Sequence, residues 1–158
     1  MLKDLFDTWS SLYSNHAALR TSIEFLHVGG LVAGGGCAVA ADRITLMAIR
    51  DDAGTRALRL AALKGIHRVV VAGLIVIIIS GVLMFGADVD MFLYSKAFWL
   101  KMGLMLLLIA NGVVLVRAER RVEHGDQAAW SQLKYTATAS LALWFLTTLA
   151  GSALPNIG

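Results

Sequence analysis

A carboxylate and an imidazole lie three residues apart, at Glu24 and His27, in a stretch of chain that is otherwise apolar and rich in glycine. On an α-helix, side chains at this spacing are neighbours. Together they can ligate a metal ion, and the histidine alone can be the axial ligand of a haem iron. Ionisable groups are costly inside a membrane and usually mark a functional site there. Glu24 and His27 are therefore candidate metal ligands.

A third ionisable residue, Lys101, follows Phe98 and Trp99 about one turn inside another apolar stretch. In an antiparallel bundle it would lie at nearly the same depth as His27. Opposite charges in a medium of low dielectric constant are less costly together than apart. We expect Glu24, His27 and Lys101 to form one cluster in the outer half of the membrane. The alternative is that Lys101 extends outward to the headgroups.

The elements that must position these residues are four apolar stretches. A helix crossing about 30 Å of hydrocarbon needs roughly 20 residues, and backbone in lipid must satisfy its own hydrogen bonds. In a chain of 158 residues with 58% hydrophobic and 16% charged content, the pattern predicts an all-α integral membrane protein. We expect one domain, residues 1–158, folded as an antiparallel four-helix bundle. The predicted spans are about 23–42, 67–86, 97–117 and 135–154.

Apolar residues at three- and four-residue spacing precede the first span, over residues 2–16, with Trp9 among them. This pattern predicts an amphipathic helix in the outer interface of the membrane. Thr21 and Ser22 are expected to cap the first span, which puts Glu24 in its first turn. A carboxylate there complements the helix dipole, so Glu24 also has an ordinary structural explanation.

Ten of the fourteen Lys and Arg residues lie between the first and second spans or between the third and fourth. By the positive-inside rule, loops 43–66 and 117–134 are cytoplasmic and both termini are outside. We expect a multi-pass protein of the cell inner (plasma) membrane with periplasmic termini. The basic residues then meet lipid headgroups, and no nucleic-acid partner is expected.

Gly30 and Gly34 have the four-residue spacing that lets two helices approach closely. The pair predicts tight packing inside the bundle. It also offers a surface for a homo-oligomer or for a larger membrane complex, and a flat cofactor would suit the same smooth surface.

The remaining histidines restrict the possible cofactor sites. His67 lies at the inner edge of the second span, about 20 Å from the depth of His27, so one haem cannot be held by both. A dinuclear iron site needs several Glu-x-x-His helices, and this chain has only one. The single Cys37 cannot form an intrachain disulfide.

Several short motifs resemble those of small uncharacterised bacterial four-span membrane proteins. They are residues 26–30 (Leu-His-Val-Gly-Gly), 42–43 (Asp-Arg), 80–85 (Ser-Gly-Val-Leu-Met-Phe), 98–101 (Phe-Trp-Leu-Lys) and 110–111 (Ala-Asn). The histidine of the first span and the Phe-x-x-Lys opening the third are remotely similar to HemJ-type protoporphyrinogen oxidases and CopD-like copper-resistance membrane domains. The HemJ resemblance implies haem b, His27 as its axial ligand, and Lys101 as a catalytic residue or a partner of a porphyrin carboxylate.

Three functions remain open. The first, which we favour, is a haem-associated redox protein with an outer-leaflet site at His27 and Lys101. The second is the handling or transport of copper or iron ions through Glu24, His27 and Met84. The third is a non-catalytic accessory subunit of a larger membrane complex. Whether the protein is an enzyme is not decided by the sequence.

Overall fold

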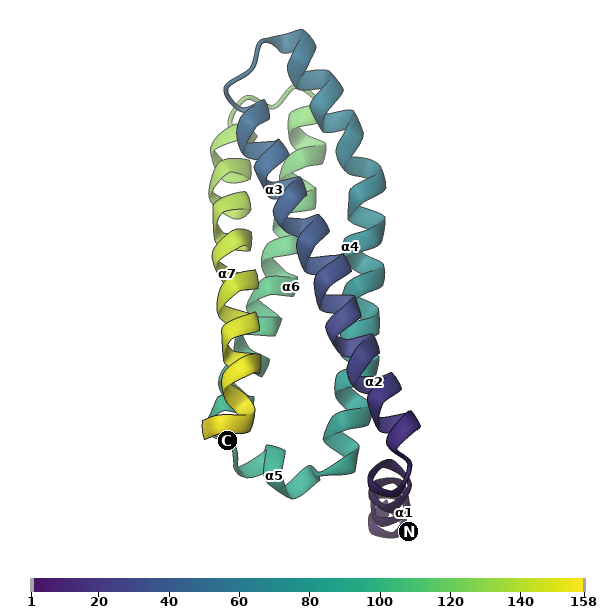
Figure 1. Cartoon of the computed structure of the whole chain (residues 1–158). Coiled ribbons are helices and arrows are strands. Elements are labelled where there is room, and N and C mark those ends of the chain that lie inside the picture. The colour runs from purple at the N-terminus through teal and green to yellow at the C-terminus, as the bar shows by residue number, and fades with distance from the viewer. Residues whose placement is uncertain (1, 158) are drawn as a thin grey trace.

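Helices make up nearly all of the computed structural model, which describes residues 2–157. In chain order they are α1 (Leu2–Asn15), α2 (Ala17–Gly30), the π-helical turn η1 (Leu31–Gly35), α3 (Gly36–Ala48), α4 (Ala53–Ala87), α5 (Val89–Tyr94), α6 (Lys96–Glu123) and α7 (Ala129–Ile157). The elements α2, η1 and α3 follow one another as one long rod. This rod, α4, α6 and α7 run side by side in alternating directions, while α1 turns away from their axis (Figure 1).

Within the described residues, four helices are long and apolar enough to cross a membrane, which confirms the predicted all-α, four-span bundle. They are Ala17–Ala48, Gly54–Ala87, Lys96–Glu123 and Ala129–Leu154. Large apolar side chains such as Val71, Ile75 and Val82 are exposed along α4, as expected where lipid replaces water. The protein is therefore a multi-pass membrane protein.

The two ends of the bundle differ. Both termini and α5 lie at one end, which we call the α5 end, and the α3–α4 and α6–α7 connections lie at the other, which we call the loop end (Figure 1). Each of the four rods extends beyond its predicted span. At the loop end, α4 begins early because the Asp52 carboxylate accepts hydrogen bonds from the amides of Gly54 (3.0 Å) and Thr55 (3.1 Å) and so caps the helix.

The expected capping of the first span by Thr21 and Ser22 is wrong. Helix α2 begins at Ala17, so Ser22 is internal, and its hydroxyl donates to the Ala18 carbonyl at 2.8 Å. Thr21 is likewise inside the helix, and Glu24 lies about two turns from its start. The reason is local: Ala17, Ala18 and Leu19 favour helix strongly, so the helix starts before the polar residues. Glu24 is thus beyond the reach of the dipole at the helix start.

The glycines of the first rod pack tightly against α4, as their spacing predicts. A Cβ atom on Gly30 would lie 3.1 Å from the Gly73 carbonyl oxygen, and one on Gly34 would lie 3.1 Å from Gly73 Cα. Both residues are buried. The proposed oligomer or complex surface at Gly30 and Gly34 is therefore corrected, because α4 of the same chain already covers it.

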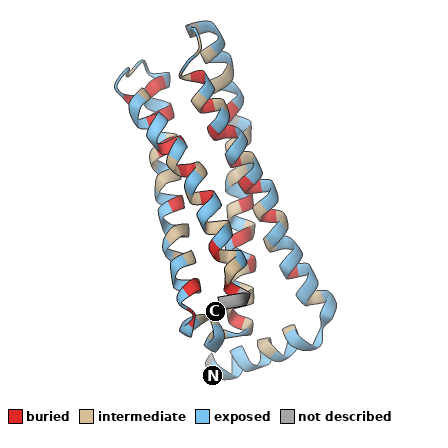
Figure 2. Ribbon diagram, turned by 60° about the vertical axis from the view of Figure 1, so that its left-hand side comes forward, coloured by how far each residue is buried: buried red, intermediate tan, exposed pale blue. Residues whose placement is uncertain are grey.

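The rods form two pairs. Helix α6 packs mainly along α7, and α4 packs along α2, η1 and α3, while α3 joins the pairs by packing on α7. Buried residues follow the inner faces of the rods (Figure 2). The core has one cluster near the loop end and another near mid-height, where Ala38, Ile77, Leu108 and Trp144 meet. Below this second cluster, toward the α5 end, the pairs separate.

Helix α1 contacts the α5 end of α4. The Trp9 indole N–H donates to the Leu83 carbonyl at 2.9 Å, and the ring packs beside Gly86. An indole that is apolar on one side and hydrogen-bonded on the other is typical of a membrane interface. This contact fixes α1 to the bundle.

Candidate functional site

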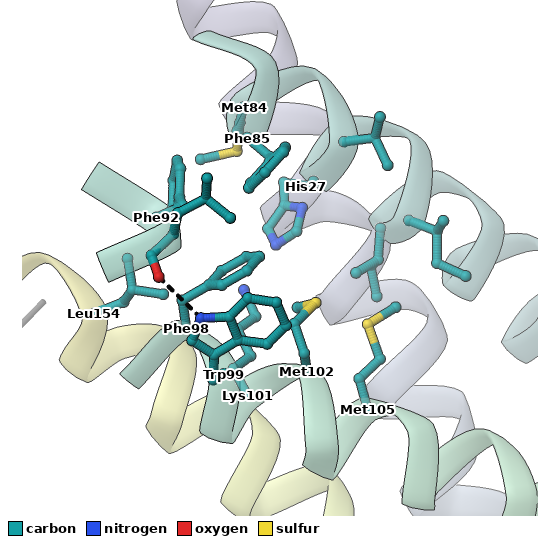
Figure 3. Close-up of a pocket in the computed structure, with 15 residues that line it drawn as sticks. His27, Met84, Phe85, Phe92, Phe98, Trp99, Lys101, Met102, Met105 and Leu154 are labelled. Atoms are coloured by element: carbon teal, nitrogen blue, oxygen red, sulfur yellow. Dashed lines mark hydrogen bonds between the residues drawn. The ribbon is translucent and has the colours of Figure 1, made fainter. Parts of the chain in front are cut away.

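A cavity of about 360 Å³ lies at the α5 end, where the two helix pairs separate. Its walls come from α2, α4, α5, α6 and α7. They are almost wholly apolar, with one imidazole and one ammonium group among aromatic and thioether side chains (Figure 3). The labelled lining residues are His27, Met84, Phe85, Phe92, Phe98, Trp99, Lys101, Met102, Met105 and Leu154.

Helix α5 and a cluster of aromatic rings build the wall of this cavity between α4 and α6. The Phe98 ring stacks on Phe85 with centroids 5.5 Å apart and packs against Phe92 at 5.4 Å. The Trp99 indole donates to the Leu93 carbonyl at 2.9 Å. These rings connect α4, α5 and α6 without bringing α4 and α6 into close backbone contact, and this leaves the space open.

His27 is half-buried, and one of its ring nitrogens is already engaged. Its Nδ1 atom lies 2.9 Å from the Ser80 hydroxyl oxygen, and that hydroxyl donates its only proton to the Val76 carbonyl at 2.6 Å. We therefore assign the proton of the neutral imidazole to Nδ1, which donates to Ser80. The other nitrogen, Nε2, is then an unprotonated acceptor, and the ring directs it into the cavity (Figure 3).

Lys101 lines the same cavity as His27, so the structure brings together two of the three residues expected to cluster. Two glycines make this possible. A Cβ atom on Gly151 would lie 3.3 Å from Lys101 Nζ, and one on Gly81 would lie 3.4 Å from His27 Cε1. The charge of Lys101 is close enough to act on the imidazole. The site is therefore a basic pair in an apolar cavity.

Glu24 does not line this cavity. Its side chain is exposed and accepts a hydrogen bond from the Tyr13 hydroxyl at 3.3 Å. Partial burial and the charge of Glu24 raise the pKa of the Tyr13 phenol. The structure thus separates Glu24 from His27 and Lys101. Among the described residues, no group of three or more His, Cys, Asp and Glu side chains could hold a metal ion.

The sequence reasoning missed most of the sulfur atoms at the site. Of the three methionines that line the cavity, only Met84 was considered, whereas Met102 and Met105 were not. Their position could have been predicted from the sequence. Phe98, Met102 and Met105 recur at helical spacing on the face of α6 that also carries Lys101.

The fold and this cavity define a class, a multi-pass helical membrane protein with an apolar, basic-lined cavity at one end of its bundle. The chain belongs to DUF6644, a family of unknown function whose model matches residues 7–155. Comparison with the curated proteins and with the solved structures gave no match. This membership agrees with the resemblance to small uncharacterised membrane proteins, and no relation to HemJ-type or CopD-like proteins was found.

Proposed function

We propose that the protein is a membrane redox protein that binds haem b in the cavity at the α5 end, with His27 as the axial ligand. The observation that carries this proposal is the state of the His27 ring. Ser80 engages Nδ1 at 2.9 Å, and Nε2 is directed into an apolar cavity. A ligating histidine in metalloproteins commonly has its second nitrogen hydrogen-bonded in this way, which fixes its tautomer and orientation.

The ammonium group of Lys101 favours a cofactor that carries negative charge. Two like unit charges about 6 Å apart repel by about 3 kcal/mol at an effective dielectric constant of about 20. In the described part of the chain, no ion pair joins Lys101 to an acidic side chain that would cancel this repulsion. A bare metal cation beside His27 would experience it in full. Haem brings its own propionate groups, and Lys101 would pair with one of them.

The shape of the site suits a flat apolar group. Two residues that line the cavity, Val82 and Trp99, are 63% and 57% exposed, so the cavity is not fully enclosed. A macrocycle wider than the enclosed volume can therefore extend toward the lipid. The rings of Phe85, Phe92 and Phe98 offer the apolar surface on which it would stack.

Each lining group then has a distinct part in the proposed chemistry. Haem, when bound, supplies one-electron redox chemistry. His27 holds the iron, Ser80 fixes the orientation of the ring, and Lys101 pairs with a carboxylate. The phenylalanine rings exclude water, which sets the local dielectric and with it the reduction potential.

We also propose that the α5 end faces the outside of a bacterial inner membrane. The loop end carries both basic connections, including Arg50, Arg59 and Arg121. The positive-inside rule then places this end in the cytoplasm and the cavity in the outer leaflet.

The test of the haem proposal is the visible absorption spectrum of protein purified from haem-supplied cells. We expect a Soret band in the wild type and its loss in His27→Ala. The matched control is His16→Ala, because His16 is exposed and its Nδ1 contacts the Leu12 carbonyl of α1, at 3.0 Å. A wild type without a Soret band, or a His27→Ala variant that keeps it unchanged, contradicts the proposal.

A copper site is the second candidate, and the cavity itself gives it one specific support. Three thioethers, from Met84, Met102 and Met105, share the cavity with the free nitrogen of His27. Thioether and imidazole groups are the soft ligands that Cu(I) prefers. Elemental analysis separates the two functions. Bound copper without a Soret band, lost in both His27→Ala and Met102→Leu, supports copper handling, whereas bound iron with a Soret band supports haem.

The third function, an accessory subunit, has lost the docking surface suggested for it, because α4 of the same chain covers Gly30 and Gly34.

A further inference from the structure

A second polar cluster is buried in the loop-end half of the bundle. It brings together Asp42 of α3, His67 of α4 and Glu119 of α6. Asp42 is 3% exposed and Glu119 is 9% exposed, although carboxylate side chains are almost never fully buried without a partner. Neither the haem proposal nor the copper alternative uses these residues.

Each of the two carboxyl groups has a polar neighbour and one oxygen without a hydrogen-bond partner. The Ser140 hydroxyl of α7 hydrogen-bonds to the Asp42 carboxyl group, and His67 Nδ1 lies 3.6 Å from Glu119 Oε2. The remaining oxygens, Asp42 Oδ2 and Glu119 Oε1, have no hydrogen-bond partner in the described structure and no appreciable surface accessible to water.

The charges around the cluster are mostly negative. The charge of Glu123, one turn further along α6, and the charge of Asp42 both act on Glu119. His67 is the positively ionisable partner on α4, and the contribution of α7, Ser140, is neutral. If both buried carboxyl groups were ionised, a single imidazolium would have to balance two negative charges in a medium of low dielectric constant, which is costly.

The packing of the unsatisfied oxygens decides which ligand can neutralise them. An oxygen that a water molecule cannot reach has no room for a hydrated cation. Nor do the His, Cys, Asp and Glu side chains of the described residues form a group of three that could hold a metal ion here. A proton is the one cation that needs no additional space.

We propose that Asp42, Glu119 and His67 form a proton-binding site that holds a carboxyl proton at neutral pH and exchanges it with the loop end through His67. In the exchange step, the O–H bond of Glu119 breaks as an N–H bond forms at His67 Nδ1. The products are a carboxylate and an imidazolium. The imidazolium then releases its Nε2 proton to water. His67 suits this part because 24% of its side chain is exposed, against 12% for Glu119.

This site is independent of the haem proposal. Asp42 follows His27 by fifteen residues along the same rod, which is about 22 Å at 1.5 Å per residue. The apolar cluster of Ala38, Ile77, Leu108 and Trp144 fills the bundle between them. The two sites can therefore be tested separately, and loss of one leaves the other intact.

The direct test is infrared spectroscopy of the wild-type protein in lipid nanodiscs. A protonated carboxyl group has a carbonyl stretching band that ionised carboxylates lack. Exposed Asp and Glu side chains are ionised above about pH 6, so any band that persists at pH 7 and shifts in D₂O belongs to a buried carboxyl group. We expect such a band in the wild type. Its absence at pH 7 would overturn the proposal without any variant.

Variants then assign the band and the exchange route. We expect the band to weaken in Asp42→Asn or Glu119→Gln and to be unchanged in Asp90→Asn, a matched control at an exposed position of α5. In His67→Gln we expect the band to remain and its hydrogen–deuterium exchange to slow by roughly 100-fold. A band that survives in both Asp42→Asn and Glu119→Gln, or exchange that is unaffected in folded His67→Gln, contradicts the proposal.

Discussion

Substitution of Gly73 by alanine tests the helix contact that positions His27. A Cβ atom at this position would lie 2.6 Å from Gly34 Cα, 2.8 Å from Gly34 N and 2.9 Å from the Gly30 carbonyl oxygen. Non-bonded carbon atoms normally sit about 3.5–4.0 Å apart, so the first rod must move away from α4 by about 1 Å. The obstacles are all backbone atoms, which no side-chain rotation can relieve.

The expected change in the free energy of unfolding is the sum of two opposing effects. Overpacking a well-packed contact costs about 1–3 kcal/mol, and rigid backbone on the opposing helix favours the upper end of that range. Alanine gains about 1 kcal/mol over glycine in helix propensity. We therefore expect Gly73→Ala to lower the free energy of unfolding by about 2 kcal/mol.

The matched control is Gly65→Ala on the same helix, where an added Cβ atom meets nothing within 4 Å. This variant should be as stable as the wild type or more stable by up to about 1 kcal/mol. The assay is reversible unfolding in mixed micelles, followed by circular dichroism. If Gly73→Ala proved as stable as Gly65→Ala, the α2–α4 contact described above would be wrong.

Three further predictions concern single side chains. Ser80→Ala removes the partner of His27 Nδ1, so we expect cofactor affinity to fall about 10- to 100-fold in a haem titration while the fold is kept; unchanged affinity would show that Ser80 does not position the ring. Lys101→Met removes an ammonium without a carboxylate partner among the described residues, and we expect about 1 kcal/mol higher stability in thermal unfolding together with weaker haem binding; tighter binding would contradict the charge argument. Hydrogen bonds from Thr55 hold the pKa of the Asp52 carboxyl below its usual range. The Asp52 carboxylate therefore contributes fully to the free energy of unfolding above its pKa in the unfolded chain, which is about 3.9. This contribution is lost as the pH falls through the lower pKa of the folded state. We expect the stability difference between wild type and Asp52→Ala to be constant at neutral pH and to vanish in acid, and a difference that grows in acid would refute this.

The membrane class and the four helices could be predicted from the sequence because long apolar stretches have a single solution in lipid. The residues at which the helices begin and end were predicted less accurately. The first span was expected to start at about residue 23, with Thr21 and Ser22 as its caps, but the helix already begins at Ala17. The caps of a helix depend on one or two side chains, and several candidates often compete for the same position.

Only part of the site was predicted correctly. The reason is that the spacing of residues on a helix does not fix the direction in which that helix face points. Glu24 and His27 are helical neighbours, yet Glu24 meets Tyr13 while His27 turns to Ser80. The pairing of His27 with Lys101 rested on depth, which apolar stretches define well. His27 and Lys101 line the same cavity because Gly81 and Gly151 leave room for their side chains. This arrangement depends on packing between helices that are far apart in sequence.

The carboxyl cluster was missed because Asp42 lies near the end of a span, where a charged residue looks interfacial. The burial of Glu119, in contrast, could have been predicted from the sequence. Glu119 follows Leu115 by four residues and precedes Val122 by three, which places it on the buried face of α6. A carboxylate on a buried helix face is a stronger indication of a site than its distance from the span end.

The central claim is that His27 Nε2 ligates haem iron in the cavity at the α5 end. Its most direct test is to add haem to protein from haem-depleted cells, in nanodiscs, and to record electron paramagnetic resonance spectra of the wild type and of His27→Ala. The account predicts saturation at one haem per chain and a nitrogen-ligated ferric signal that disappears in His27→Ala. No saturable binding, or the same ferric signal in both proteins, would contradict it.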